Sequence, residues 1–215
     1  MKRRGRAAAA AVAGACAPSA SRGRAGHRIR IIGGRWRRTP IHVADVEGLR
    51  PTPDRVRETL FNWLGQRIDG WRCLDLFAGT GALGFEAASR GAARVVLVER
   101  DRRARAAIGQ TLERLGSPPQ LELVAADAFD ALRRLASAGE RFDLVFVDPP
   151  FGESLHLRVL DALPAVLAPG ALVYLESGER FEMPAQWRVL REGRAGQVRY
   201  HLLSRAADAL PGHDA

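Results

Sequence analysis

The residues Asp148-Pro149-Pro150-Phe151 place a carboxylate, two rigid prolines and an aromatic ring directly after residues 142–147, an apolar stretch typical of a buried strand. Ligands of open α/β sheets bind at the carboxyl ends of the strands. Proline lacks a backbone N–H and fixes its own φ angle, so this turn would be stiff and its carbonyl oxygens free to accept hydrogen bonds. Such a turn could hold a flat ring that carries an amine. The alternative is a loop that only ends the strand.

A second candidate site is the G-x-G-x-x-G pattern formed by Gly79, Gly81 and Gly84. Alone, this pattern is a weak signal. Here it lies between an expected strand, 72–77, and an expected helix, 81–90, which is the context of a turn that binds a nucleotide-like cofactor. Glycine lets the backbone approach a ligand where a Cβ atom would clash.

Carboxylates accompany this turn at successive strand ends. Glu99 ends the next strand and could bind both hydroxyls of a ribose, whereas Asp127 follows the third strand and could meet an adenine amine. A dinucleotide and S-adenosylmethionine both fit a glycine turn with a ribose acid. Asp75 favours S-adenosylmethionine, because a buried carboxylate needs a partner and an ammonium group suits it better than a pyrophosphate. Alternatively, Asp75 only caps the helix. The predicted cofactor-binding residues are Asp75, Phe77, Ala78, Gly79, Thr80, Gly81, Glu99 and Asp127.

Charge is unevenly distributed along the 215 residues. Residues 1–50 hold 12 Lys or Arg and 2 Asp or Glu, whereas residues 51–215 hold 21 and 22. This asymmetry predicts a basic arm for a polyanion such as nucleic acid, attached to a nearly neutral domain. A solvated arginine-rich tail is the alternative. A hydrophobic content of 47% and the chain length predict one folded domain.

Residues 1–26 are of low complexity and are expected to be disordered. Their basic start and alanine run imitate a secretory signal, but Val12 is the only larger aliphatic residue, so a cleaved signal is the weaker alternative. Cys16 and Cys73 do not suggest a disulfide framework, and no run of 18 apolar residues occurs. We therefore expect a cytoplasmic protein without a membrane span, a metal site or a fixed oligomeric partner, acting as a monomer.

The arm is expected to become ordered as a basic β-hairpin. Residues 28–32 alternate in charge and bulk, Gly33-Gly34 can form a turn, and 35–38 would be the returning strand. Arginine can bind phosphate, and Trp36 could stack on a base or else pin the hairpin to the domain. The predicted nucleic-acid-binding residues are Arg30, Arg35, Trp36, Arg37, Arg38, Arg50 and Arg55.

After the arm, Thr52 as N-cap and Pro53 as first residue predict a helix. Its buried stripe would be Val56, Leu60, Leu64 and Ile68. Strands are then expected at 72–77, 94–99, 121–125, 142–147 and 171–176. They alternate with helices at 81–90, after Asp101 up to Gly116, at 128–138, and at 155–168 with a break near Pro164. This alternation predicts a parallel α/β sheet with helices on both faces. The chain ends differently, with strands 187–191 and 198–203 joined by a short link as an antiparallel hairpin.

Taken together, these segments resemble the class I S-adenosylmethionine-dependent methyltransferases that modify exocyclic amines of nucleobases. More closely, residues 28–34, 49–52, 54–64 and 196–198 are similar to the bacterial RsmD family, and the resemblance covers about residues 28–205. It does not cover the Ala/Arg-rich tail.

The resemblance implies a Rossmann-like, seven-stranded, mostly parallel sheet with an antiparallel last strand, and methylation of the N2 amine of a specific guanine in 16S rRNA of the small ribosomal subunit. Asp75, Gly79 and Gly81 would then hold the methionine end of S-adenosylmethionine, Glu99 its ribose and Asp127 its adenine. The catalytic residues would be Asp148, Pro149, Pro150 and Phe151.

This interpretation divides the chain into a tail (1–26), a basic arm (27–50), a methyltransferase domain (51–207) and a short C-terminus (208–215). One alternative is a DNA adenine or cytosine amino-methyltransferase, although that class more often carries Asn in place of Asp148. A non-catalytic RNA-binding assembly factor is another. A dehydrogenase is disfavoured by Asp75 and by the terminal hairpin.

Overall fold

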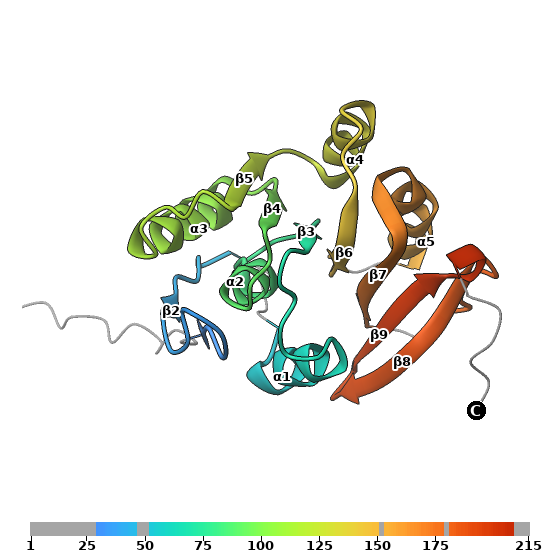
Figure 1. Cartoon of the computed structure of the whole chain (residues 1–215), viewed down its shortest axis with the longest axis horizontal. Helices are drawn as coiled ribbons and strands as arrows, with labels where there is room; N and C mark the ends of the chain where they lie inside the picture. Colours follow the sequence, from blue (N-terminus) through green and yellow to red (C-terminus); the bar gives the residue numbers. More distant parts are fainter. Residues whose placement is uncertain (1–28, 47–51, 151–152, 179–180, 209–215) are drawn as a thin grey trace, which may run out of the picture.

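The computed structural model describes residues 29–46, 52–150, 153–178 and 181–208. Its centre is a seven-stranded sheet in the order β5-β4-β3-β6-β7-β9-β8, with helices on both faces (Figure 1). The strands are β3 (Arg72–Asp75), β4 (Arg94–Glu99), β5 (Leu121–Ala125), β6 (Phe142–Val147), β7 (Leu167–Ser177), β8 (Trp187–Ala195) and β9 (Val198–Arg205). The first five run parallel, and β9 lies antiparallel between β7 and β8. The predicted antiparallel last strand is therefore confirmed.

Two apolar clusters pack on the two faces of this sheet, because side chains alternate along each strand. One face carries α1 (Asp54–Trp63), α2 (Ala82–Ser89) and α3 (Arg102–Arg114), and the other carries α4 (Ala128–Ser137) and α5 (Glu153–Ala162). The short helix η1 (Leu163–Val166) follows α5 and contains Pro164, so the expected break in that helix is confirmed. A second short helix, η2 (Ala206–Asp208), follows β9.

Strands β4, β5 and β6 begin and end at the predicted residues. The terminal hairpin is longer than predicted, since β8 continues to Ala195 and only two residues separate it from β9. Gly193 had suggested a loop, but it pairs with Tyr200, whose ring would lie 2.4 Å from a Cβ atom at this position. The lack of a side chain thus makes room for the tyrosine, and strand pairing overrides the turn signal.

The first helix begins one residue later than predicted. Pro53 is the N-cap residue of α1, and its carbonyl oxygen accepts the first helical hydrogen bonds. Thr52 does not cap the helix; its side chain instead hydrogen-bonds to Glu176 at the end of β7. The helix ends at Trp63, so Ile68, although buried as expected, lies in the following loop.

The N-terminal hairpin exists, but its second strand was misplaced. Strand β1 (Ile29–Arg30) pairs with β2 (Pro40–Ile41), whereas residues 33–38 form the turn between them. The start of the turn bonds to α2, since the Ile32 and Gly33 N–H groups donate to the Glu86 carboxylate at 2.8 and 2.7 Å, and only its end returns to the first arm, where the Arg38 N–H donates to the Ile31 carbonyl oxygen at 2.7 Å. Competition from this helix explains why no returning strand forms at 35–38.

Glu86 is the centre of a buried charged network that joins the hairpin, α1 and α2. Its carboxylate lies 3.5 Å from Arg57 and 2.8 Å from Arg90, and the Glu86 and Arg57 side chains have no exposed surface. Arg57 also donates to the Arg30 carbonyl oxygen at 3.0 Å. Every residue of α2 is buried, and the hairpin shares one apolar cluster with α2 and the sheet. The hairpin therefore belongs to the same packed unit as the sheet.

Replacing this carboxylate should therefore destabilise the whole fold. Glu86→Ala leaves Arg90 buried without its anion and leaves Arg57 with Asp54 alone, so we expect the free energy of unfolding to fall by about 3–5 kcal/mol. Chemical denaturation measures the loss. The control is Glu113→Ala on the exposed side of α3, which should change the free energy by less than about 0.5 kcal/mol. Equal effects of the two substitutions would contradict this role for Glu86.

Within the described ranges, no helix is long and apolar enough to cross a membrane.

Candidate functional site

Carboxylates from neighbouring strands gather on one face of the sheet, at its carboxyl edge. They are Asp75 of β3, Glu99 of β4, Asp148 directly after β6, and Glu176 of β7. Asp75 pairs with Phe146 across the sheet, and Phe146 pairs with Tyr174. Because residues two apart on a strand share a face, Asp148 and Glu176 emerge on the side to which Asp75 points. The sheet register thus brings together residues that lie up to 101 positions apart in the sequence.

The glycine turn follows Asp75 and begins α2, as predicted. Gly79 and Gly81 have φ angles of 54° and 75°, in the left-handed region that glycine adopts without strain. A Cβ atom at Gly84 would lie 2.3 Å from the Leu97 side chain, so this glycine allows α2 to pack closely on β4. Of the other predicted turn residues, Ala78 and Thr80 are buried and Phe77 is half-buried.

Asp75 caps α2, which is one of the two roles that the sequence had left as alternatives. Its Oδ2 atom accepts a hydrogen bond from the Gly84 N–H at 3.0 Å, which caps the buried start of α2. Its pKa is raised to about 7, first by burial and further by Glu99 and Glu176, while the bond from Gly84 opposes the rise. Since a carboxylate offers about four acceptor positions, capping leaves Asp75 able to bind a ligand cation.

Glu99 and Asp127 are held by backbone N–H groups at two further strand ends. The two oxygens of Glu99 accept from Gly79 at 2.8 Å and from Asp101 at 2.7 Å, which fixes the plane of the carboxylate beside the glycine turn. Asp127 is exposed and caps α4 by accepting from the Phe129 N–H at 2.9 Å. Each carboxylate keeps further acceptor positions for ligand hydroxyl or amine groups.

Asp148 and Glu176 are neighbours on adjacent strands, since the preceding residues, Val147 and Leu175, are paired in register. The pKa of Asp148 is raised well above its ordinary value, first by burial of the carboxyl group and then by repulsion from Glu176 and Asp75. Two like charges this close disfavour simultaneous ionisation. A nearby positive charge would therefore favour ionisation of both carboxyl groups.

Glu176 was not among the predicted site residues. It is 5% exposed, and its Oε1 atom accepts a hydrogen bond from the Tyr174 hydroxyl at 2.9 Å, while Thr52 supplies another. Burial raises its pKa, and these two hydrogen bonds act in the opposite direction. Thr52 comes from a part of the chain far from β7 in sequence, so only the folded arrangement identifies the group.

In the described part of the chain, no Lys or Arg side chain pairs with Asp75, Asp148 or Glu176. Buried carboxylates without cationic partners are costly, so this edge suits a positively charged ligand rich in hydrogen-bond donors. The described residues contain no group of His, Cys, Asp or Glu side chains that could hold a metal ion.

The remaining predicted catalytic residues follow Asp148. Pro149 is buried and Pro150 is exposed, whereas Phe151 lies outside the described residues. Arg50, predicted to bind nucleic acid, also lies outside them.

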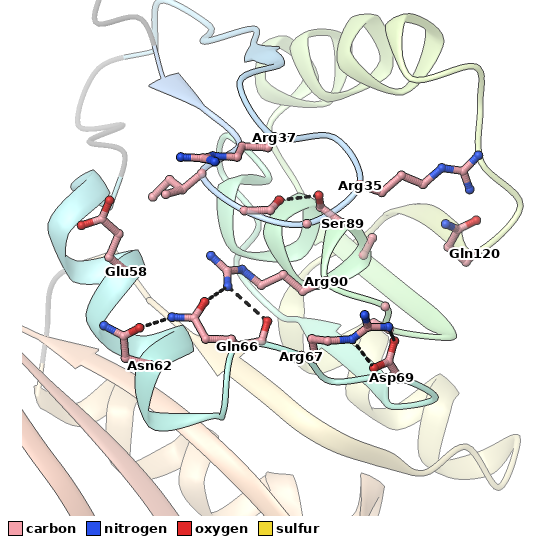
Figure 2. A pocket seen from close by; sticks show the side chains of 16 residues that line it. Arg35, Arg37, Glu58, Asn62, Gln66, Arg67, Asp69, Ser89, Arg90 and Gln120 are labelled. Carbon is pink, nitrogen blue, oxygen red and sulfur yellow. Dashed lines mark hydrogen bonds and ion pairs between the residues drawn. The ribbon is translucent and has the colours of Figure 1, made fainter.

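The predicted basic residues do not form one surface. Arg35 and Arg37 line a groove of about 920 Å³ together with Arg67, Arg90 and Gln120. Figure 2 shows Arg35 and Arg37 on the hairpin turn, with Arg90 between this turn and Gln66. The groove borders the segments that precede β4 and β5, so it lies at the amino ends of the strands, opposite the carboxylates.

The other members of the basic set are spread over the hairpin and α1. Arg30 and Arg38 are exposed on the hairpin, and Arg55 is exposed in the first turn of α1, three positions after Thr52, whose side chain contacts Glu176. Trp36 is half-buried, packs against the core and donates its backbone N–H to Ser89 at 2.9 Å. These contacts favour a pinning role for Trp36 over base stacking.

A family model, curated relatives and solved structures give consistent matches to this chain. Residues 29–204 match the protein family described as "Conserved hypothetical protein 95". Ribosomal RNA small subunit methyltransferase D of Escherichia coli (strain K12) is 46% identical over 185 residues, covering 84% of this chain and 91% of that protein. The protein of the same name from Haemophilus influenzae is 41% identical and covers 81% of this chain and 92% of its own. The solved structure described as putative methyltransferase yhhF from Escherichia coli has a TM-score of 0.73 and 45% identity, covering 83% of this chain and 98% of that one.

Proposed function

Because the chain belongs to the family of ribosomal RNA small subunit methyltransferase D, we propose that it methylates the exocyclic N2 amine of a guanine in the RNA of the small ribosomal subunit. The methyl donor is S-adenosylmethionine. The enzyme acts as a monomer in the cytoplasm, on the assembled or assembling subunit. The observation that carries this proposal is the set of uncompensated carboxylates beside the glycine turn.

The donor set fits this cofactor. Gly79 and Gly81 allow close approach of the backbone, Asp75 keeps acceptor positions for an ammonium group, and Glu99 is oriented for ribose hydroxyls. S-adenosylmethionine, when bound, supplies a methyl group on a positively charged sulfur. Burial, and after it repulsion from neighbouring carboxylates, raises the pKa values of Asp75 and Asp148, and a cationic ligand would relieve that repulsion.

The reaction needs help from the protein because the lone pair of an aromatic amine is delocalised into the ring. The Asp148 carboxylate and the Pro149 carbonyl oxygen can each accept one hydrogen of the N2 amine, which concentrates electron density on nitrogen. As the nitrogen bonds to the methyl carbon, the bond from that carbon to sulfur would break with its electron pair left on sulfur, and the proton that the nitrogen loses would pass to Asp148. Holding the amine in line can contribute about 7–11 kcal/mol through alignment alone.

The target base must be unpaired or rotated out of its helix to reach this edge. Phosphates of the neighbouring nucleotides then need positive charge close to the carboxylates. Arg55 is exposed in the first turn of α1, three positions after Thr52, which contacts Glu176. We assign it to phosphate contact near the catalytic edge, and the hairpin arginines to more distant RNA.

Arg55→Ala should weaken binding of the ribosomal substrate without changing the chemistry. Loss of one phosphate contact is expected to reduce the slope of log affinity against log salt concentration by about 1. Binding titrations at several salt concentrations measure this slope. Arg134→Ala, an exposed arginine of α4 on the opposite face, is the matched control and should leave the slope unchanged. Equal slopes for the two variants would remove Arg55 from the RNA interface.

The proposed function is tested by supplying S-adenosylmethionine with a labelled methyl group together with unmethylated small subunits, free small-subunit rRNA, or duplex DNA. We expect label in the ribosomal RNA, mapped to the N2 position of one guanine. Label that appears only in DNA would instead establish a DNA amino-methyltransferase. Absence of transfer to any substrate, with the cofactor bound, would favour a non-catalytic assembly factor.

A further inference from the structure

We propose that Glu176 selects guanine as the target base by accepting a hydrogen bond from its N1–H group, next to the N2 amine held by Asp148. This inference rests on the proposed function and deepens it. Guanine is the only standard base that presents a ring N–H donor beside an exocyclic amine on its Watson–Crick edge. Two adjacent acceptors in the protein would match these two adjacent donors.

The sheet provides such a pair of acceptors. Val147 pairs with Leu175, so the next residues, Asp148 and Glu176, leave neighbouring parallel strands at the same level. Neighbouring strands are about 4.8 Å apart, and both side chains emerge on the face that carries α1 and α2. The 2-amine of guanine lies between N1 and N3, and a base that reaches Asp148 with this amine and turns its Watson–Crick edge toward β7 presents N1–H to Glu176.

Glu176 is held in place as an acceptor. The Tyr174 hydroxyl donates to Oε1 at 2.9 Å, and Thr52 donates from the segment before α1. Both contacts favour the ionised carboxylate, and they use two of its four acceptor positions. The side chain is 5% exposed and has no cationic partner among the described residues. An N–H donor from the substrate would satisfy an acceptor position that the protein leaves open.

The same arrangement disfavours the other amine-bearing bases. Adenine and cytosine both carry a lone pair on the ring nitrogen next to the amine, and this lone pair would face the Glu176 carboxylate. A buried carboxylate opposed by another acceptor loses its hydrogen bond and gains repulsion. Sites that hydrogen-bond a substrate group discriminate strongly against analogues that lack it, because their own buried polar groups are then left unpaired.

The test uses small subunits reconstituted with ligated rRNA that carries either guanine or 2-aminopurine at the mapped target. The analogue 2-aminopurine keeps the 2-amine but has an acceptor in place of N1–H. We expect the wild-type enzyme to methylate it at least about 100-fold more slowly than guanine in kcat/KM. Glu176→Gln should slow guanine methylation at least about 10-fold and bring the ratio of the two rates near 1, because its amide can donate to the acceptor.

Glu192→Gln makes the same chemical change on the exposed side of β8 and should leave both rates unchanged. Cofactor affinity and thermal unfolding of Glu176→Gln are measured to detect a structural effect. Such an effect would slow methylation of guanine and of 2-aminopurine equally. A wild-type enzyme that methylates 2-aminopurine as fast as guanine overturns the inference, as does an unchanged ratio in Glu176→Gln. A wild-type enzyme that transfers nothing to guanine refutes the proposed function itself.

Discussion

The Asp148→Ala variant is expected to lose about 10²–10⁴-fold in the rate of methyl transfer while binding S-adenosylmethionine nearly as well as the wild-type protein. Asp148 follows β6 directly, and its carboxyl group has a pKa raised well above the ordinary value by burial and by Glu176 and Asp75. The group should act on the amine, since Asp75 and Glu99 remain to hold the cofactor. Single-turnover kinetics and calorimetric binding of the cofactor measure the two quantities separately.

Two further variants sharpen this prediction. Asp148→Asn keeps one carbonyl acceptor but cannot take a proton, so its rate should fall between those of the wild type and Asp148→Ala. Asp130→Ala removes a half-buried carboxylate of α4, paired with Arg133 on the other face of the sheet, and should change neither rate nor affinity. If Asp148→Ala lost cofactor affinity and rate in equal proportion, Asp148 would be a structural residue.

The affinity for S-adenosylmethionine is expected to depend on pH through Asp75. The pKa of Asp75 is raised to about 7 in the ligand-free protein, chiefly by burial. A cationic ligand binds the ionised carboxylate, and below pH 7 that form is the minor one. The apparent dissociation constant should therefore rise about tenfold for each pH unit below 7 and become constant above it. Isothermal titration calorimetry in buffers of different ionisation enthalpy would also detect the proton released on binding.

Asp75→Asn separates the charge of this group from its capping role. The amide oxygen can still accept the hydrogen bond from Gly84, so the start of α2 should be preserved. The variant loses the charged contact, which should weaken cofactor binding by about 1.5–3 kcal/mol above pH 7 and remove the slope below it. A slope that persists in Asp75→Asn would assign the released proton to Asp148 or Glu176, whose pKa values are also raised.

The tertiary structure also divides the arginines that the sequence analysis had grouped in one nucleic-acid-binding set. Arg35 and Arg37 lie by the groove at the amino ends of the strands, whereas Arg55 lies in the first turn of α1, three positions after Thr52, which contacts Glu176. Net charge records how many arginines a segment holds and not which edge of a sheet they reach. The turn that carries Arg35 is placed by Gly34, whose φ angle is 73° and where a Cβ atom would lie 1.9 Å from the Ser89 carbonyl oxygen.

Local signals were sufficient wherever neighbouring residues determine the structure. The apolar stretch 142–147 predicted β6, and Asp101 caps α3 as expected by accepting from the Arg103 and Ala104 N–H groups. The glycine turn was also predictable from the sequence, and Gly79 and Gly81 adopt positive φ angles between β3 and α2. Each of these features depends on backbone preferences and hydrogen bonds within a few residues.

The motif Asp148-Pro149-Pro150-Phe151 was recognisable by itself, but its chemical surroundings were not. Glu176 becomes its neighbour only because β6 and β7 pair in register, and Thr52 reaches Glu176 only because α1 packs on the same face. Likewise, the hairpin turn follows hydrogen bonds to Glu86, 53 and 54 residues away, in place of the local strand pattern. The sequence by itself therefore determined most elements of the central sheet and the turn that we propose to bind the amine. Only the tertiary structure decided which distant carboxylate stands beside it, because strand register and helix packing are set by contacts between residues far apart in the chain.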